Sequence, residues 1–284
     1  MGKLNLLTAE QRVNFFCDGF LCLRGFINDE WLTQLNDAAE HAINYSRSVI
    51  KTNDWLDVES DHSAEKPRLR RLMKPQDFDP LFWEFASQGP FIDLAEDLLG
   101  QHVKFHHGKL NYKWSGGGAE VKWHQDIPFW PHTSYNVLTI GVALDHIDET
   151  MGPMGVIPGS HKGPIYNHYA PDGQWQGFIN DDDLASIATG TAEYNTGPVG
   201  TVTIHHCRAV HGSQPNLNPL KPRPLLLFAY SNAASLPIMP YNQDSQYNGA
   251  IVCGHHPKFP EIDMEPCRLP PLKGQRSIFE SQQT

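Results

Sequence analysis

The clearest candidate for chemistry is a histidine and an aspartate two positions apart, in Trp123-His124-Gln125-Asp126. In a β-strand, residues i and i+2 project from the same face, so His124 and Asp126 can direct an imidazole nitrogen and a carboxylate oxygen to one point. Both atoms are good ligands for a transition metal. The pair alone equally fits a surface histidine and aspartate at a strand end, so a metal site depends on further ligands.

A third ligand is offered by Val210-His211-Gly212-Ser213, which follows a predicted strand over 199–206. Two histidines and one carboxylate on one face of a metal leave three positions open, the arrangement found in non-haem Fe(II) oxygenases. A structural zinc site would instead be closed by four protein ligands. His124, Asp126 and His211 therefore predict an open metal site.

An arginine follows at a fixed distance from this motif. Arg223 lies twelve residues after His211, at the start of the apolar run 225–228. A guanidinium pairs with carboxylates in a bidentate geometry, so Arg223 predicts a carboxylate-binding site inside the fold, where Ser213 could add a hydroxyl. The alternative for Arg223 is an ordinary cation on a surface turn.

With the segments Gly152-Pro153-Met154-Gly155 and Ile157-Pro158-Gly159-Ser160-His161, these motifs closely resemble the phytanoyl-CoA dioxygenase family over roughly residues 8–232. The resemblance rests on four motifs in the right order, which is more specific than a histidine and an aspartate alone. It implies an enzyme that uses Fe(II), 2-oxoglutarate and O₂, with a double-stranded β-helix core. It also implies the products succinate and CO₂ beside the oxidised substrate.

Residue roles follow from the same resemblance. It implies that iron is bound by His124, Asp126 and His211. The residues that it implies near 2-oxoglutarate are Arg223, Ser213, Asn111, Thr139 and His107. His107 stands where ectoine-hydroxylase-like members often carry glutamine. Halogenases of the family replace the carboxylate ligand with a small residue, so the presence of Asp126 favours hydroxylation or a related oxidation.

The elements that must position these residues change character near residue 100. Before it, capping residues and apolar spacing predict helices over about 9–18, after Asn28-Asp29, and over 90–99. After it, short alternating runs predict strands over 102–114, 136–145, 152–157, 199–206 and 224–231. The chain is therefore expected to be α+β and mainly β, with N-terminal helices packed on a barrel or sandwich.

Alternation within two of these strands predicts which faces look inward. On 102–114, period-two geometry places His107, Lys109, Asn111 and Lys113 on one polar face. On 136–145, Thr139, Gly141 and Ala143 share a face of small side chains, which suits a barrel that holds a ligand.

The family resemblance gives this organisation a name, a jelly-roll or cupin-like core. We expect one oxygenase domain over 1–284. It would comprise a mostly helical part over 1–100, the core over 101–232 with a lid loop at 160–198, and a proline-rich covering segment over 233–284.

The substrate is harder to read, because the segments 46–80, 127–135 and 160–198 would select it and carry no recognisable motif. Arg68, Arg70, Arg71 and Lys74 form a basic cluster that could accommodate an anionic group, such as a phosphonate, a carboxylate or an acyl-CoA; salt bridges to nearby acids are the alternative. The residues assigned to the substrate pocket are Phe129, Trp130, His132, Arg68, Arg70 and Arg71. For the aromatic residues among them, plain core packing is the alternative.

Composition excludes several classes of protein. With 284 residues, of which 40% are hydrophobic and 19% charged, the chain is expected to be globular. Its 22 basic and 32 acidic residues give a net charge of −10, which leaves no basic field for nucleic acid or an anionic membrane. The five cysteines form no disulfide framework and the N-terminus lacks a secretory signal, so a cytoplasmic protein is expected.

The sequence thus predicts an Fe(II)- and 2-oxoglutarate-dependent dioxygenase that hydroxylates an unactivated C–H bond of a small molecule, with an anionic substrate among the options. A lipid-like or natural-product substrate is the alternative. A zinc or manganese hydrolase would have no use for Arg223, and a non-catalytic binding protein would not need all three ligands. The oligomeric state is not predicted. Most other histidines, including His205, His206 and His161, are assigned no metal ligation.

Overall fold

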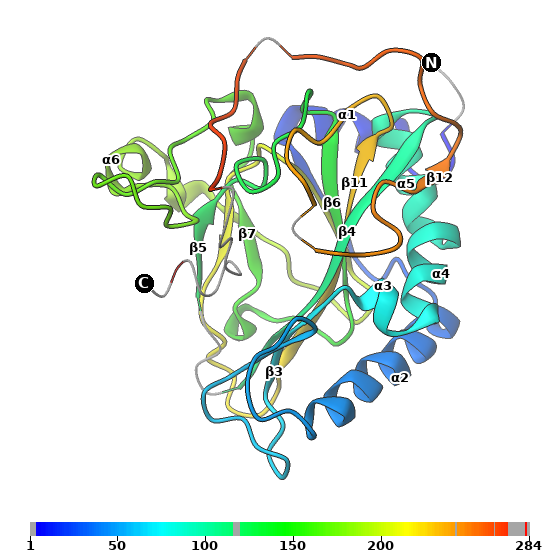
Figure 1. Cartoon of the computed structure of the whole chain (residues 1–284), viewed down its shortest axis with the longest axis vertical. Coiled ribbons are helices and arrows are strands. Elements are labelled where there is room, and N and C mark those ends of the chain that lie inside the picture. Colours follow the sequence, from blue (N-terminus) through cyan, green and yellow to red (C-terminus); the bar gives the residue numbers. More distant parts are fainter. Residues whose placement is uncertain (1–3, 116–119, 242, 264, 272–281, 283–284) are drawn as a thin grey trace.

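The computed structural model describes residues 4–115, 120–241, 243–263, 265–271 and 282 (Figure 1). Within them, antiparallel pairing forms an eight-stranded sheet, ordered β1-β9-β6-β11-β4-β3-β2 with β12 beside β4, and a four-stranded sheet, ordered β5-β10-β7-β8. The strands are β1 (Phe20–Leu23), β2 (Leu56–Val58), β3 (Leu69–Met73), β4 (Val103–Lys113), β5 (Val121–His124), β6 (Val137–Ala143), β7 (Met154–Val156), β8 (Glu193–Tyr194), β9 (Val202–His206), β10 (His211–Ser213), β11 (Arg223–Asn232) and β12 (Ile251–Cys253).

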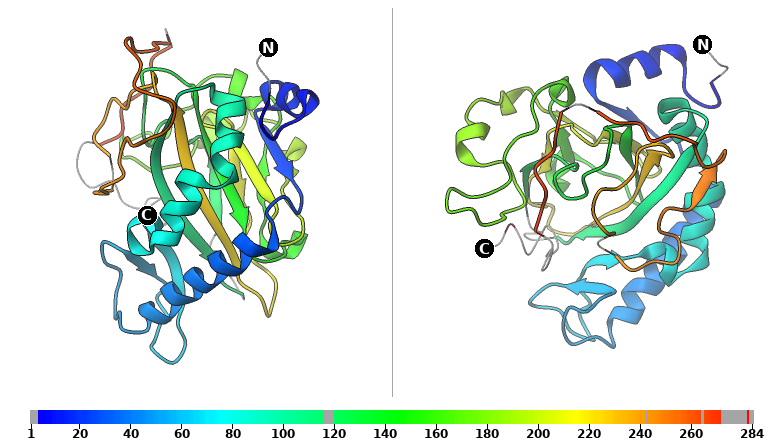
Figure 2. Two further views of the ribbon diagram at one scale, coloured as in Figure 1. Left: turned by 90° about the vertical axis from the view of Figure 1, so that its right-hand side faces the viewer. Right: turned by 45° about the horizontal axis from the view of Figure 1, so that its top comes forward.

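Helices precede most of the strands and lie across the outer face of the large sheet (Figure 2). They are α1 (Ala9–Asp18), α2 (Asp29–Ser46), α3 (Pro75–Phe78), α4 (Pro80–Gln88) and α5 (Pro90–Leu99). The later α6 (Asp181–Leu184) lies apart from them, beyond β5 and β7 (Figure 1). The predicted ends of the first helix are confirmed for α1. Thr8 and Gln11 form a capping box at its N-terminus, and Gly19 ends it with φ 83°.

Alternation along the long strands separates a helix-facing layer from an inner layer. On β11, Leu226, Phe228 and Tyr230 are buried in the main hydrophobic core that the helices share. The Tyr230 hydroxyl donates to the carbonyl of Ala86 in α4 at 2.8 Å, so this buried polar atom is satisfied and ties the helix to the sheet.

The inner layer matches the predicted faces. In register, Leu225 on β11 stands opposite Asn111 on β4 and Ala143 on β6, while Thr139 on β6 stands opposite His205 on β9. The polar column of β4 and the small residues of β6 therefore share the inner side of the sheet, as the alternation predicted.

Several elements were not predicted. Within 46–80 the strands β2 and β3 pair with each other, and β3 adds to the edge of β4. β5 and β10 have four and three residues, too few for a periodic signal, and they exist through pairing with each other. Most of the segment 272–284 lies outside the described residues, so the expected covering role is traced only through β12 and the irregular chain around it.

The predicted lid loop contains only short elements, among them α6 and β8. All five cysteines are free thiols. In the described part of the chain, no helix combines the length and apolar character needed to cross a bilayer.

One glycine tests the packing that supports the small sheet. Gly152 enters β7 at φ 62°, and a Cβ there would clash with the backbone oxygen of Gln214. We expect Gly152→Ala to destabilise the fold by about 1–3 kcal/mol, measured by urea unfolding, because the backbone must leave a conformation that alanine disfavours. The control is Gly190→Ala, where a Cβ meets no atom within 4 Å. Equal unfolding midpoints for the two variants would contradict this account.

Candidate active site

Pairing of β5 with β10 brings the predicted ligands together. His124 and His211 stand opposite each other in the antiparallel register, and Asp126 follows β5 by two residues. One ligand atom from each residue lies within 4.8 Å of the others, and Asp126 Oδ1 is 3.9 Å from each histidine Nε2. All three residues are buried. Three donor atoms on one side of a small volume can hold a metal ion with open positions.

Backbone contacts orient both histidines toward that volume. His124 Nδ1 donates to the carbonyl of Lys122 at 2.9 Å, and His211 Nδ1 donates to the carbonyl of Ala209 at 3.0 Å. In each ring this leaves the Nε2 lone pair for a metal. Burial lowers the pKa of His124 to about 4 and the pKa of His211 well below its ordinary value. Both rings are thus neutral near pH 7, the form that binds metals.

The second oxygen of Asp126 is held by two donors. Asp126 Oδ2 accepts a hydrogen bond from the Thr139 hydroxyl at 2.9 Å and another from His205 Nε2 at 3.1 Å. Burial by itself raises the pKa of Asp126, yet the His205 hydrogen bond and nearby charges hold it well below the ordinary value. The carboxylate is therefore ionised, with Oδ1 left to face His124 and His211.

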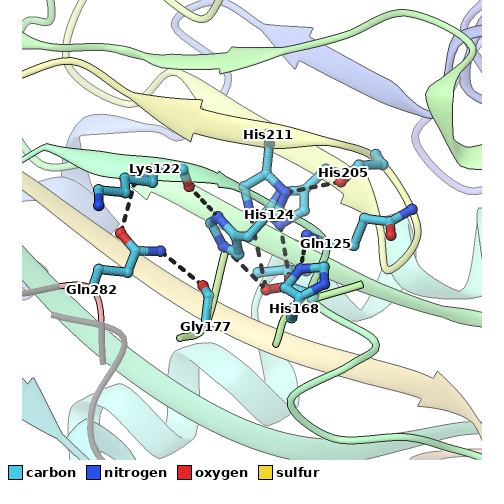
Figure 3. A network of polar contacts seen from close by, with 11 residues as sticks. Lys122, His124, Gln125, His168, Gly177, His205, His211 and Gln282 are labelled. Carbon is cyan, nitrogen blue, oxygen red and sulfur yellow. Dashed lines mark hydrogen bonds and ion pairs between the residues drawn. The ribbon is translucent and has the colours of Figure 1, made fainter. Parts of the chain in front are cut away.

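His205 is a site residue that the sequence interpretation set aside. Strand alternation correctly predicts that at most one of His205 and His206 faces the site, but no local signal distinguishes them. His205 gathers with His124 and His211 (Figure 3), with its ring centroid 4.3 Å from that of His211. His206 points away from the site toward α1. Its ring centroid lies 6.4 Å from that of Phe15 in this helix.

Gln125, between the two predicted ligands, anchors the lid loop. Its side chain is fully buried, and Nε2 donates to the carbonyls of Pro164 and Arg208 at 3.1 and 2.8 Å. Its Oε1 accepts from Tyr166 N at 2.9 Å, while Gln125 N donates to His168 Nε2 at 3.0 Å (Figure 3). The loop therefore fixes the backbone that carries the ligand pair.

A residue near the end of the chain reaches the same strand. Gln282 Oε1 accepts from Lys122 N at 2.8 Å, and Gln282 Nε2 donates to the carbonyl of Gly177 in the lid loop at 2.9 Å (Figure 3). Gln282 thus connects the outer edge of β5 to that loop.

A cavity of about 60 Å³ lies between the two sheets, beside the three ligand atoms. Arg223 is 4% exposed, and its Nε and Nη1 are buried with no hydrogen-bond partner among the described residues. Burial lowers the pKa of Arg223 to about 10, so it stays charged at pH 7. Because a buried charge is costly unless it is paired, this guanidinium fits an anionic ligand. The cavity is lined by Arg71, Lys109, Asn111, Val121, His124, Met154, His205, His211, Gly212, Ser213, Arg223, Leu225 and Leu227.

Two of the predicted cosubstrate contacts line this cavity with their polar groups engaged. The Ser213 hydroxyl accepts from Lys113 Nζ at 2.7 Å, and Lys113 also donates to the carbonyls of Ser213 and Gln214. Asn111 Oδ1 accepts from Arg71 Nε at 2.8 Å. The hydroxyl hydrogen of Ser213 and the amide nitrogen of Asn111 form no hydrogen bond with a described residue, so both can donate to a ligand.

The other predicted residues lie elsewhere around the site. Thr139, expected near the cosubstrate, instead supports Asp126. His107 and His106 share a hydrogen bond between their Nδ1 atoms at 2.6 Å, and the ring centroids of Trp130 and His132 lie 5.2 and 4.9 Å from that of His106. These histidines and Trp130 form an aromatic cluster outside the described cavity lining.

Phe129 contacts the candidate metal centre directly. Its ring lies edge-on to His124, with centroids 5.8 Å apart, and to Trp175 of the lid loop at 5.2 Å. It packs over the ligand and outside the described cavity lining.

The basic cluster divides between the two sides of β3. Arg68 Nε pairs with Asp61 at 2.8 Å, and Arg70 Nη2 pairs with Glu59 at 3.0 Å, as the salt-bridge alternative expects. Arg71 lines the cavity. Of the six residues assigned to the substrate pocket, Arg71 alone is part of the described lining.

Comparisons with known proteins place the chain among oxygenases. A family profile described as "Phytanoyl-CoA dioxygenase (PhyH)" matches residues 15–224. The chain is 32% identical over 279 residues to a probable alpha-ketoglutarate-dependent hypophosphite dioxygenase of Stutzerimonas stutzeri, covering 96% of each chain. It is 28% identical over 249 residues to an L-proline trans-4-hydroxylase of Streptomyces griseoviridis, covering 81% of this chain and 89% of that one.

Solved structures show the same fold. The crystal structure of EctD from S. alaskensis with bound Fe matches with a TM-score of 0.70 at 23% identity, covering 88% of both chains.

The hydrogen bond that Thr139 donates to Asp126 Oδ2 generates a prediction. Thr139→Val removes the donating hydroxyl and keeps the side-chain volume, so we expect Fe(II) affinity, measured anaerobically, to fall about 10–100-fold. The matched control is Thr203→Val on β9, because the buried Thr203 hydroxyl has no hydrogen-bond partner within the described ranges. If Thr203→Val weakened Fe(II) binding as much as Thr139→Val, the hydrogen bond to Asp126 would not be the cause.

Proposed function

We propose that this chain, a member of the phytanoyl-CoA dioxygenase family, hydroxylates a small-molecule metabolite. Like its relatives, it is an Fe(II)- and 2-oxoglutarate-dependent dioxygenase. The observation that carries the proposal is the buried Arg223 guanidinium, whose Nε and Nη1 have no partner in the described part of the chain, in the cavity beside three converging metal-ligand atoms. The first feature fits the distal carboxylate of 2-oxoglutarate, and the second fits Fe(II).

Iron would be held by His124 Nε2, His211 Nε2 and Asp126 Oδ1. The donor set fits because both rings are neutral with Nε2 directed inward, and because the carboxylate is ionised with its other oxygen occupied. Three protein ligands leave room for a bidentate cosubstrate and for O₂. Bound together, iron, 2-oxoglutarate and O₂ supply the oxidation: R–H, O₂ and 2-oxoglutarate become R–OH, succinate and CO₂.

The chain's own residues position the reactants. Arg223 and the Ser213 hydroxyl would hold the distal carboxylate, and Asn111 would donate its amide to the same molecule. Leu225 and Leu227 supply an apolar wall beside it. Gln125 keeps the lid loop on the site, so water is excluded during the reaction.

We propose that the two facing sheets are a double-stranded β-helix, or jelly roll, that forms one oxygenase domain with the helices. The cavity between the sheets supports this arrangement, since the ligands come from the small sheet and Arg223 from the large one.

A compact, polar substrate is favoured over a lipid-like one. The relatives that match over 80% or more of this chain are named for hypophosphite, L-proline and ectoine, whereas those named for phytanoyl-CoA match over 62% of it.

The assignment predicts a spectroscopic signature. Anaerobic addition of Fe(II) and 2-oxoglutarate should give the weak visible charge-transfer band of the chelate. We expect the band to be lost in His124→Ala and His211→Ala, and Arg223→Met to need about 10–100-fold more 2-oxoglutarate to form it, because a charge-assisted pair is removed.

The control for these variants is His41→Ala, since the His41 side chain is 59% exposed and remote from the ligands in the chain. It should form the band as wild type does. A wild-type protein without the band, or a band that persists in both ligand variants, would overturn the assignment.

A further inference from the structure

Two adjacent histidines of β4 point to the same side of the large sheet. His107 belongs to the inner column, two positions from Lys109 of the cavity lining. In the register with β11, His107 and Phe105 lie opposite consecutive residues, so His106 is an extra residue on β4, as in a β-bulge. The bulge brings the two rings together, with their Nδ1 atoms 2.6 Å apart. Two imidazoles thus gather on the inner side of the sheet.

A third histidine completes this histidine cluster of His106, His107 and His132, and one of its nitrogens lacks a partner. His132 Nδ1 donates to the carbonyl of Trp130 at 2.7 Å, which leaves a lone pair on Nε2. Burial lowers the pKa of His132 to about 4, so Nε2 carries no proton at pH 7. Nε2 is buried and has no hydrogen-bond partner among the residues that the structure describes. A buried acceptor of this kind is costly unless a donor reaches it.

Strand register separates the histidine cluster from the cosubstrate residues. Six residues after Arg223, β11 reaches Ala229, which lies between His107 on β4 and Thr139 on β6. Because Thr139 holds the Asp126 carboxylate, this row marks the level of the metal centre. A 2-oxoglutarate that chelates the metal and ends on Arg223 extends away from this row, a step that rests on the proposed function. The cluster is therefore left to a different ligand.

The lining of the cavity agrees with this separation. None of the three histidines is part of the described lining, which contains Arg223, Ser213 and Asn111. His106 and His132 are buried, whereas His107 is partly exposed, so ligand contact begins at His107.

Further along the inner face, β4 and β11 carry two more polar side chains. Ser231 is fully buried, and its hydroxyl has no hydrogen-bond partner within the described part of the chain. Lys104 lies opposite Ser231, and its ammonium donates to the carbonyls of Ala233 and Ser235 at 3.4 and 3.0 Å. This end of the inner face is thus polar, with its one ammonium engaged and a buried hydroxyl still to be satisfied.

We infer that the histidine cluster binds the polar head group of the substrate, and that this group is a hydrogen-bond donor, a hydroxyl or an amino group. Burial keeps His106 and His107 neutral at pH 7, since it lowers the pKa of His107 to about 3 and that of His106 well below its ordinary value. One proton between their Nδ1 atoms leaves a lone pair on one Nε2 and an N–H on the other. With His132, the cluster presents two acceptors and one donor. A deprotonated oxyanion would face two lone pairs here, so a donating group is favoured.

Histidine ¹⁵N NMR tests this inference without turnover. Protein labelled with [¹⁵N]histidine and loaded with Zn(II) and 2-oxoglutarate is titrated with ethylene glycol, with ethylammonium and with acetate. These probes offer a hydroxyl, an ammonium and acceptors alone. We expect at least one of the two donors to shift the Nε2 resonance of His132 toward the protonated range, because its lone pair then accepts a hydrogen bond. Acetate should leave that resonance unchanged.

Substitution of His132 supplies a second readout. His132→Phe removes the acceptor, so donor binding, reported by the His106 and His107 resonances, should weaken about 10-fold. The Kd for 2-oxoglutarate should stay within about twofold of wild type, because the cluster and Arg223 are separate sites. His132→Gln, whose amide oxygen can accept, should bind the donor more tightly than His132→Phe. The matched control is His41→Phe, since the His41 side chain is 59% exposed, and it should bind as wild type does.

The inference would be overturned if acetate shifted the His132 resonance as much as the donors, or if neither donor shifted it. Donor binding to His132→Phe as tight as to wild type would also overturn it. So would a loss of 2-oxoglutarate affinity in His132→Phe as large as in Arg223→Met, which would make the cluster part of the cosubstrate site. Failure of the proposed function is a separate result, because wild type would then bind no 2-oxoglutarate, whatever the histidine resonances do.

Discussion

The carboxylate of Asp126 serves two structural tasks with its two oxygens, and the rest of the site is arranged around that division. Thr139 and His205 occupy Oδ2 from two neighbouring strands of the large sheet, which leaves Oδ1 near the two histidines of the small sheet. The contact therefore joins the sheets at the metal centre. A carboxylate free to rotate could bind a metal through both oxygens, and it would then close positions that a cosubstrate and O₂ require.

The end of β5, which carries His124, is also held by hydrogen bonds to the lid loop. Gln125 sends its side chain away from the metal and into the lid loop, where His168 returns a contact to the Gln125 backbone. Gln282 adds a link between β5 and that loop. Loop and ligands thus form one hydrogen-bonded unit, so changes in a loop that selects substrate reach the metal ligands through Gln125.

Much of this site could be predicted from the sequence, because it depends on spacing that survives folding. His124 and Asp126 are two positions apart, with Asp126 just beyond the end of β5, and the ordered motifs identified the family, which the family match confirms. His205 and Gln125 could not be assigned in this way. Their roles depend on which residue faces them across strands distant in the chain, and one sequence carries no register. The two interpretations of the basic cluster could not be separated for the same reason, since Arg68 and Arg70 meet acids whose positions only the fold reveals, while Arg71 lines the cavity.

The most direct test is an anaerobic crystal structure with Mn(II) and 2-oxoglutarate bound. The account predicts a metal on His124 Nε2, His211 Nε2 and Asp126 Oδ1, with Asp126 Oδ2 still held by Thr139 and His205 and the distal carboxylate of 2-oxoglutarate on Arg223. A metal bound by His205 or by both oxygens of Asp126 would contradict it, as would a distal carboxylate seated on Lys109.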